Sequence, residues 1–178
     1  EEYDYIKNSI YKTYLACDAV SEEILLSHHY RCNEKIIAFN NQKYYNNKLV
    51  INSQSQADTP LIFKNIAGNT TNYKNTAPRE AEEIIEFIKD NPDKSIGVIT
   101  PFTNQKELIH AMLQENGMKD VPCGTVHAFQ GDEKDVVLFS LALTEQTGQG
   151  TYDWLKNNKE LINVATSRAK EQLVIPFL

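Results

Sequence analysis

Short apolar runs alternate with amphipathic segments in the second half of the chain, and this alternation constrains the fold more than any other feature. Residues 95–100 and 136–143 have the apolar character of buried strands. Between them, residues 103–116 carry apolar side chains at helical spacing, and Gly117 follows as a stop signal. Strands that alternate with helices of about ten to fifteen residues indicate a parallel sheet wrapped by helices. The pattern predicts a single α/β domain with a doubly wound, mostly parallel sheet.

The remaining elements are predicted from the same periodicities and from local stop and start signals. Pro78 is expected in the first turn of a helix whose apolar residues follow the helical repeat, and Asn33 is expected to cap another helix. Further helices are predicted over residues 3–20 and 158–169, and further strands over residues 23–27, 61–66, 123–127 and 172–175. Polar connections are predicted over residues 46–60 and 67–76, a flexible loop at Gly148-Gln149-Gly150, and a packing anchor at Trp154.

The size and composition of the chain are those of one globular domain. Its 178 residues, 41% apolar and 24% charged, allow one packed core and are few for two. No run of about eighteen apolar residues occurs, so no membrane-spanning helix and no membrane partner are expected. We assign residues 1–20 to an N-terminal linking helix and residues 21–178 to the domain. Because the chain begins at Glu1 without a signal peptide, we expect it to be a piece of a larger protein.

Charge and cysteine content narrow the setting further. The formal net charge of −6 argues against tight, autonomous binding of nucleic acid, because neutralising phosphates drives such binding. It leaves room for a local strip of cationic side chains. The three cysteines, Cys17, Cys32 and Cys123, are odd in number and far apart, which favours a reducing compartment, by default the cytoplasm. Even with His28 and His29 they lack the spacing of metal ligands, so no metal site is predicted.

Three polar stretches near predicted strand or helix ends are candidates for ligand binding, because open α/β sheets place their sites at such ends. They are residues 29–32, 124–133 and 163–170. In the third stretch, Arg168 lies on nearly the same side of a predicted helix as the apolar Leu161. An arginine there must find an anionic partner or reach a cleft. It is therefore either part of a structural salt bridge with an internal carboxylate or aimed at a phosphate.

The other two stretches also allow two interpretations each. Gly131 stands between Gln130 and Asp132-Glu133, where it would let the backbone approach a ligand while a carboxylate accepts from a ribose hydroxyl. The same residues also fit a surface β-turn. Tyr30-Arg31 offers a ring for a base and a guanidinium for a phosphate, or else a stacked surface pair.

Taken together and in this order, the stretches resemble the C-terminal half of superfamily 1 helicases of the nonsense-mediated-decay and senataxin type. The resemblance runs from about residue 21 to the C-terminus. Residues 125–133 look like motif V and residues 164–170 look like motif VI. Residues 99–102 with Gln105 are similar to the family's threonine-proline-tyrosine segment, and Tyr30-Arg31 with Ile36, Phe39, Asn40, Tyr45 and Leu49 looks like its tyrosine-arginine segment. Two departures are Cys32-Asn33-Glu34, where histidine and proline are common, and Phe102 in place of tyrosine.

The resemblance implies a RecA-like fold, the second motor domain of an ATP-dependent DNA or RNA helicase or translocase, and a role for each matching residue. Tyr30 would stack on the base of ATP, Arg31 and Arg168 would be arginine fingers on the γ-phosphate, and Glu133 would hold the ribose. Gln130, as a catalytic residue, and Gly131 would lie beside the γ-phosphate. Thr100, Pro101, Phe102, Gln105, Thr125 and His127 would face single-stranded DNA or RNA, and Ser167 would couple the two sites.

The chain contains no G-x-x-x-x-G-K-[ST] sequence, so it has no phosphate-cradling P-loop of its own. The resemblance implies that an N-terminal RecA-like domain of the same polypeptide carries this loop and the ligands of Mg²⁺. The residues above would then complete an ATP site at a domain interface, and this chain alone would be inactive. The alternative is a degenerate helicase-like module that binds nucleic acid or acts as a scaffold without ATPase activity.

Overall fold

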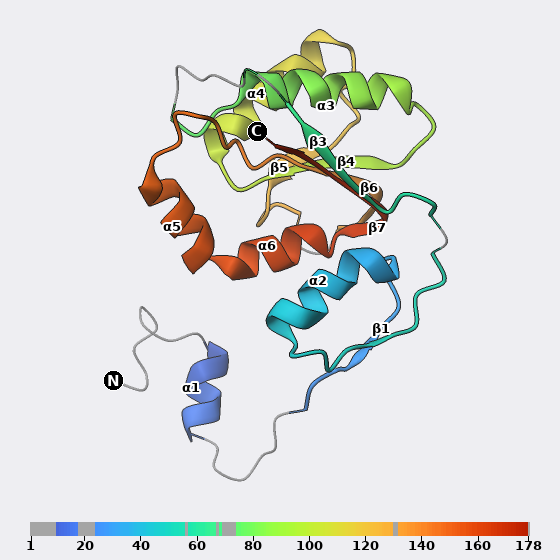
Figure 1. Cartoon of the computed structure of the whole chain (residues 1–178), viewed down its shortest axis with the longest axis vertical. Helices are drawn as coiled ribbons and strands as arrows, with labels where there is room; N and C mark the ends of the chain where they lie inside the picture. The colour runs from blue at the N-terminus through green and yellow to red at the C-terminus, as the bar shows by residue number, and fades with distance from the viewer. Residues whose placement is uncertain are drawn as a thin grey trace.

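The computed structural model describes residues 10–17, 24–55, 57–66, 68, 74–129 and 132–177. Its main sheet is five-stranded and entirely parallel, with the order β3-β7-β6-β4-β5 (Figure 1). The strands are β3 (Leu61–Asn65), β4 (Ile96–Thr100), β5 (Cys123–Thr125), β6 (Lys134–Phe139) and β7 (Ala169–Phe177). No helix in the described part of the chain is long and apolar enough to cross a membrane.

Helices cover both faces of this sheet, as expected for a doubly wound fold (Figure 1). On one face lie α3 (Pro78–Asp90) and α4 (Thr103–Glu115), and on the other lie α2 (Glu34–Tyr44) and α6 (Lys159–Thr166). The central strand β6 explains why both faces are needed. Its Val136 and Leu138 pack toward α3 and α4, whereas Val137 and Phe139 pack toward α2 and α6. A strand with apolar side chains on both faces is stable only when both are covered.

The connection from β5 to β6 crosses the sheet over β4. Because β5 and β6 flank β4 and all three are parallel, the chain must return from the carboxyl end of β5 to the amino end of β6. Phe129, in this return, is buried in the core between the sheet and the α2 and α6 side. A Cβ on Gly97 would lie 2.9 Å from Phe129 Cε1, and one on Gly124 would lie 3.0 Å from Phe129 Cδ2. The two glycines therefore create the space for the ring.

The structure confirms the predicted fold class and most of the predicted elements. Asn33 caps α2 by accepting a hydrogen bond from the backbone of Lys35, Pro78 opens α3, and Gly117 follows α4 with a φ of +74°. The helix α1 (Ile10–Cys17) lies within the predicted helix 3–20, whose other residues are outside the described ones. The predicted connection 67–76 is described only in part.

Three expectations about short elements are wrong. Residues 24–27 form no strand, and Ile24 and Leu26 are 82% and 87% exposed, so this apolar run has no core to join. Pairing occurs instead between β1 (His28–His29) and β2 (Val50–Ile51), the latter inside the predicted loop 46–60. Gly148-Gln149-Gly150 is not a flexible loop, because Gly148 caps α5 (Gln149–Asn157) and the next two residues are helical. Buried Leu155, packed near Phe102, anchors α5 in a way that periodicity does not reveal.

Replacing Gly97 with alanine is expected to lower the free energy of unfolding by about 1–3 kcal/mol, the usual range for overpacking. The new methyl group would meet both the Phe129 ring and Lys134 Cγ at 2.9 Å, and the buried ring cannot move away freely. Gly150→Ala is the matched control, because a Cβ there meets nothing within 4 Å. Urea denaturation followed by circular dichroism measures both variants. Equal stability of the two would show that Phe129 does not require the glycine.

Candidate nucleotide and nucleic-acid site

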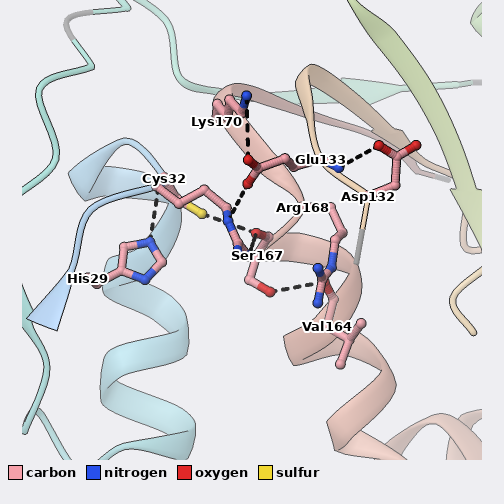
Figure 2. A network of polar contacts seen from close by, with 9 residues as sticks. His29, Cys32, Asp132, Glu133, Val164, Ser167, Arg168 and Lys170 are labelled. Atoms are coloured by element: carbon pink, nitrogen blue, oxygen red, sulfur yellow. Dashed lines mark hydrogen bonds and ion pairs between the residues drawn. The ribbon is translucent and has the colours of Figure 1, made fainter. Parts of the chain in front are cut away.

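Four charged side chains from distant parts of the sequence meet at the amino-terminal ends of β6 and β7 (Figure 2). Arg31 lies in the loop before α2, Glu133 directly before β6, Arg168 in the turn between α6 and β7, and Lys170 within β7. Parallel neighbours begin at the same edge of a sheet, which brings Glu133 beside the α6–β7 turn. The expectation that these stretches lie near element ends is confirmed, although this group lies at the amino ends of its strands.

Backbone groups fasten the Arg31 loop to the α6–β7 turn. The carbonyl oxygen of Ser167 accepts hydrogen bonds from Arg31 Nη1 at 3.4 Å and from Cys32 Sγ at 3.3 Å (Figure 2). The backbone N–H of Asn33 donates to the carbonyl of Lys170 at 2.7 Å. Glu133 completes the arrangement, because one carboxylate oxygen pairs with Arg31 Nε and the other lies 3.6 Å from Lys170 Nζ. These bonds fix the position of the Arg31 loop relative to the turn that carries Arg168.

A buried amide network joins the helices behind these two segments. The side chain of Asn40 on α2 is fully buried, and its Nδ2 donates to Asn163 Oδ1 at 2.8 Å and lies 2.9 Å from Thr166 Oγ1. Asn163 and Thr166 belong to α6, the helix that ends just before Arg168. Since buried polar groups need partners, this network fixes how α2 sits on α6.

The cluster carries an excess of positive charge, with three cationic side chains around the single carboxylate of Glu133. No carboxylate among the described residues forms an ion pair with Arg168, whose Nε donates to the carbonyl of Val164 at 3.3 Å. Burial and then the nearby charge of Arg31 lower the pKa of Arg168. Within the described residues, the structural salt bridge considered for Arg168 therefore has no partner. Two neighbouring guanidiniums beside one carboxylate, which Arg31 and Lys170 already engage, favour a further anion between them.

His29 and Cys32 stabilise the Arg31 loop through hydrogen bonds in which both side chains are neutral. The backbone N–H of Cys32 donates to Nε2 of His29 at 3.0 Å, so this ring nitrogen is an acceptor and the ring is neutral. Burial and the charge of Arg31 lower the pKa of His29, in agreement with that state. Burial raises the pKa of Cys32 to about 12, so its thiol is a neutral donor toward Ser167. Among the described residues, no three His, Cys, Asp or Glu gather to hold a metal ion.

Tyr30 stands beside this cluster with its side chain in solvent. The residue is 67% exposed, and its ring stacks on that of His28 with centroids 6.1 Å apart and an angle of 16° between the planes. Gln130 and Gly131, predicted beside the γ-phosphate, lie outside the described residues.

The predicted nucleic-acid residues are not all brought to the surface. Thr100 and Gln105 are fully buried and Phe102 is nearly so, while Pro101 and Thr125 are half-buried and His127 is exposed. Gln105 Oε1 accepts from the backbone N–H of Ala77 at 2.7 Å, and its Nε2 donates to Ser140 Oγ at 2.9 Å. Its amide is therefore occupied inside the protein. In this structure Thr100 and Gln105 stabilise the loop after β4, and their side chains are not accessible to a nucleic-acid strand.

Comparisons with known proteins identify the family of this chain. A family model described as an AAA domain matches residues 6–176. This chain belongs to that family, the C-terminal domain of UPF1-like superfamily 1 helicases.

Curated relatives of this helicase C-terminal domain are much longer than the chain. DNA polymerase alpha-associated DNA helicase A of Saccharomyces cerevisiae is 31% identical over 186 residues, which cover 82% of this chain and 26% of that helicase. RNA helicase Mov10l1 of Mus musculus is 26% identical over 194 residues, covering 90% of this chain and 16% of that protein. The chain thus spans about a quarter, or less, of the length of these relatives.

A solved structure supports the fold of the helicase C-terminal domain. The C-terminal domain of a possible DNA helicase from Lactobacillus plantarum superimposes with a TM-score of 0.53. The two chains are 14% identical, and the match covers 84% of this chain and 87% of that one. At this identity the likeness concerns the fold alone.

Sequence reasoning assigns no role to Lys170, which shares the Glu133 carboxylate with Arg31 in this helicase domain. The prediction that Trp154 is a packing anchor agrees with its contact with the Phe102 ring, although the residue is 40% exposed.

Asn40→Ala is expected to destabilise the helicase domain by about 1–3 kcal/mol, the usual result of leaving buried polar groups unpaired. The substitution would remove the hydrogen bonds that Asn40 makes with the side chains of Asn163 and Thr166 and leave Asn163 Oδ1 without its donor. Gln42→Ala, on the exposed side of the same helix, is the control and should stay within about 0.5 kcal/mol. Thermal and urea unfolding measure both. A loss for Asn40→Ala no greater than for Gln42→Ala would contradict the network's role.

Proposed function

We propose that this chain is the second motor domain of an ATP-dependent superfamily 1 helicase or translocase that acts on single-stranded DNA or RNA. One observation carries the proposal: Arg31 and Arg168 lie together in a cationic cluster, and Arg168 forms no ion pair with the nearby Glu133 or with any other described carboxylate. Two neighbouring guanidiniums can together match the oxygens of a terminal phosphate. The S. cerevisiae and M. musculus relatives are named as helicases of DNA and RNA, which supports the same reading.

We propose a task for each of these side chains in the ATP site. The guanidiniums of Arg31 and Arg168 would stabilise the charge that spreads over the γ-phosphate oxygens during hydrolysis. Tyr30, exposed beside them, would stack on the adenine. Gln130 and Gly131 would approach the γ-phosphate from the segment between β5 and β6.

Glu133 connects nucleotide binding to the release of Arg31. Its carboxylate is held by Arg31 and Lys170 in this structure, whereas the proposed role is to accept from the ribose hydroxyls. When a phosphate takes over Arg31, one carboxylate oxygen becomes free to accept such a bond. The ion pair therefore serves as the nucleotide-free arrangement of the same two side chains.

The remainder of the ATP site is expected on another domain. The chain has no P-loop, and no described cluster of acidic residues suits the octahedral oxygen coordination that Mg²⁺ requires. We place both in an N-terminal RecA-like domain of the same polypeptide, with residues 1–20 as the link. ATP would draw the two domains together by engaging the phosphate ligands of both, and hydrolysis would release them.

The connection between β5 and β6 would transmit this cycle to a bound strand. It starts at Thr125, at the carboxyl edge of the sheet near Pro101, and ends at Glu133, beside the arginines. Phe129 pins its middle to the sheet. A shift at the nucleotide end that displaces the Phe129 ring would move the exposed His127 and the partly exposed Thr125, which are proposed to touch the strand.

Arg168→Ala in the full-length protein is expected to reduce the kcat of ATP hydrolysis by about 10³- to 10⁵-fold, with a much smaller effect on nucleotide binding. Arg168→Lys should restore little, because lysine lacks the planar fork of the guanidinium. Arg79→Ala removes an arginine paired with Glu82 on the exposed side of α3 and should leave kcat unchanged. Single-turnover hydrolysis and the melting temperature of each variant are measured. Loss of activity that merely follows loss of folding, or rescue by lysine, would remove Arg168 from the site.

The 178-residue chain by itself is expected to show no ATPase activity above background, with or without single-stranded DNA or RNA. The arginines act on phosphates that a P-loop and Mg²⁺ must first position. Adding the full-length protein as a positive control identifies a failed assay. Turnover by the isolated chain that survives repurification would contradict a site shared between two domains. A full-length protein that binds strands but has no ATPase activity would favour the degenerate module.

A further inference from the structure

A cleft of about 710 Å³ lies outside the arginine cluster, where α4 and α5 begin. One wall is the turn after β4, formed by Pro101, Phe102 and Asn104, and the other is the start of α5 with Thr151 and Trp154. The volume is within the range of about 300–1,000 Å³ that small-ligand sites occupy. The cleft lies beyond the carboxyl end of β4, whereas the arginine cluster lies at the amino ends of β6 and β7. It is therefore a separate site.

Trp154 gives this cleft an aromatic wall that packing alone does not explain. The indole is tilted by 39° against the Phe102 ring, with centroids 5.5 Å apart, so the buried Phe102 supports it from behind. The neighbouring Leu155 is buried and supplies the apolar anchor of α5. Trp154 can therefore remain 40% exposed toward the cleft. A supported, half-exposed indole offers a face on which a base can stack.

The polar part of the cleft is suited to an anion. Among the described residues, its lining includes Lys74 and no carboxylate, in a chain whose net charge is −6. The N-termini of α4 and α5 both border it, and neither Phe102 nor Gly148 caps its helix with a side-chain hydrogen bond. Helix N-termini carry unpaired N–H groups and partial positive charge. A phosphate between them would be met by dipoles from two sides and by Lys74.

From this combination we propose that the cleft binds one nucleotide of the single strand, with its base on Trp154 and its phosphate between the N-termini of α4 and α5. The inference rests on the proposed function and adds Trp154 as the stacking residue for the strand. A strand fits better than a free nucleotide, because the cleft borders Pro101 at the carboxyl edge, where Thr125 ends the adjacent β5. Stacking on an indole tolerates every base, so the site is expected to hold a strand without choosing its sequence.

The chain contains one tryptophan, so its own fluorescence reports on this cleft. Titration of the 178-residue chain with oligo(dT) and with oligo(U) at low salt is expected to quench Trp154 emission. The quenching should follow the anisotropy of the labelled oligonucleotide and fade as salt rises. The two oligonucleotides distinguish a DNA strand from an RNA strand. Equal quenching by a free mononucleotide at similar concentration would overturn the assignment to a strand.

Variants on α5 separate stacking from general effects. Trp154→Ala should weaken oligonucleotide binding by about 5- to 150-fold, the range for loss of one stacked base, and Trp154→Phe by less. Tyr152→Ala is the matched control, because Tyr152 is 42% exposed on the same helix but does not line the cleft. Circular dichroism confirms that each variant is folded. Equal binding by Trp154→Ala and the original chain, or equal losses for both alanine variants, would overturn the inference.

ATPase assays distinguish this inference from the proposed function. In the full-length protein, Trp154→Ala should require about 5- to 150-fold more oligonucleotide than Tyr152→Ala for half-maximal stimulation of ATP hydrolysis. A full-length protein with strand-stimulated ATPase in which Trp154→Ala changes nothing refutes the cleft alone. A protein with neither ATPase activity nor strand binding refutes both.

Discussion

The packing of Phe129 against β4 and β5 is the constraint that fixes the path between the carboxyl edge of β5 and the arginine cluster. Gly97 and Gly124 leave room for the ring, and the described part of the return from β5 to β6 contains no helix. The same short connection has one end at Thr125 and the other at Glu133. With a helical crossover, these ends would be separated by a longer and softer segment. Here the carboxyl edge of β5 and the arginine cluster are joined by a path that is pinned at its centre.

The second constraint is the attachment of α2 to α6. Arg31 precedes one helix and Arg168 follows the other, so their separation is set by Asn40, Asn163 and Thr166 in the buried network between the helices. The Ser167 carbonyl then holds the Arg31 loop directly. Neighbouring cations repel each other, and such neighbours persist only where the surrounding structure holds them. The buried amides and the shared Glu133 provide that restraint before any anion arrives.

The sequence predicts those helices and strands whose pattern of apolar residues can be recognised within the element itself. The apolar run of β4 and the helical repeat of α3 are local, and both elements are where the pattern indicates. The pairing of β1 with β2 depends on backbone partners about twenty residues apart, and α5 depends on Leu155 reaching a cluster from another region. The same division holds for the site. Arg168 is identifiable from its motif, whereas the burial of Gln105 follows from Ala77 and Ser140, which no local pattern connects to it.

The thiol at Cys32 has a chemical consequence of its own. With a pKa of about 12, it remains protonated at physiological pH, so the bond to the Ser167 carbonyl persists without the change of charge that an imidazole would undergo. A protonated, buried thiol is also a poor nucleophile. Cys123 is partly buried, and its burial likewise raises the pKa of its thiol to about 12. Electrophilic dyes and crosslinkers will therefore react first at the exposed Cys17 on α1, which makes the native chain selectively labelled at one end without removing any cysteine.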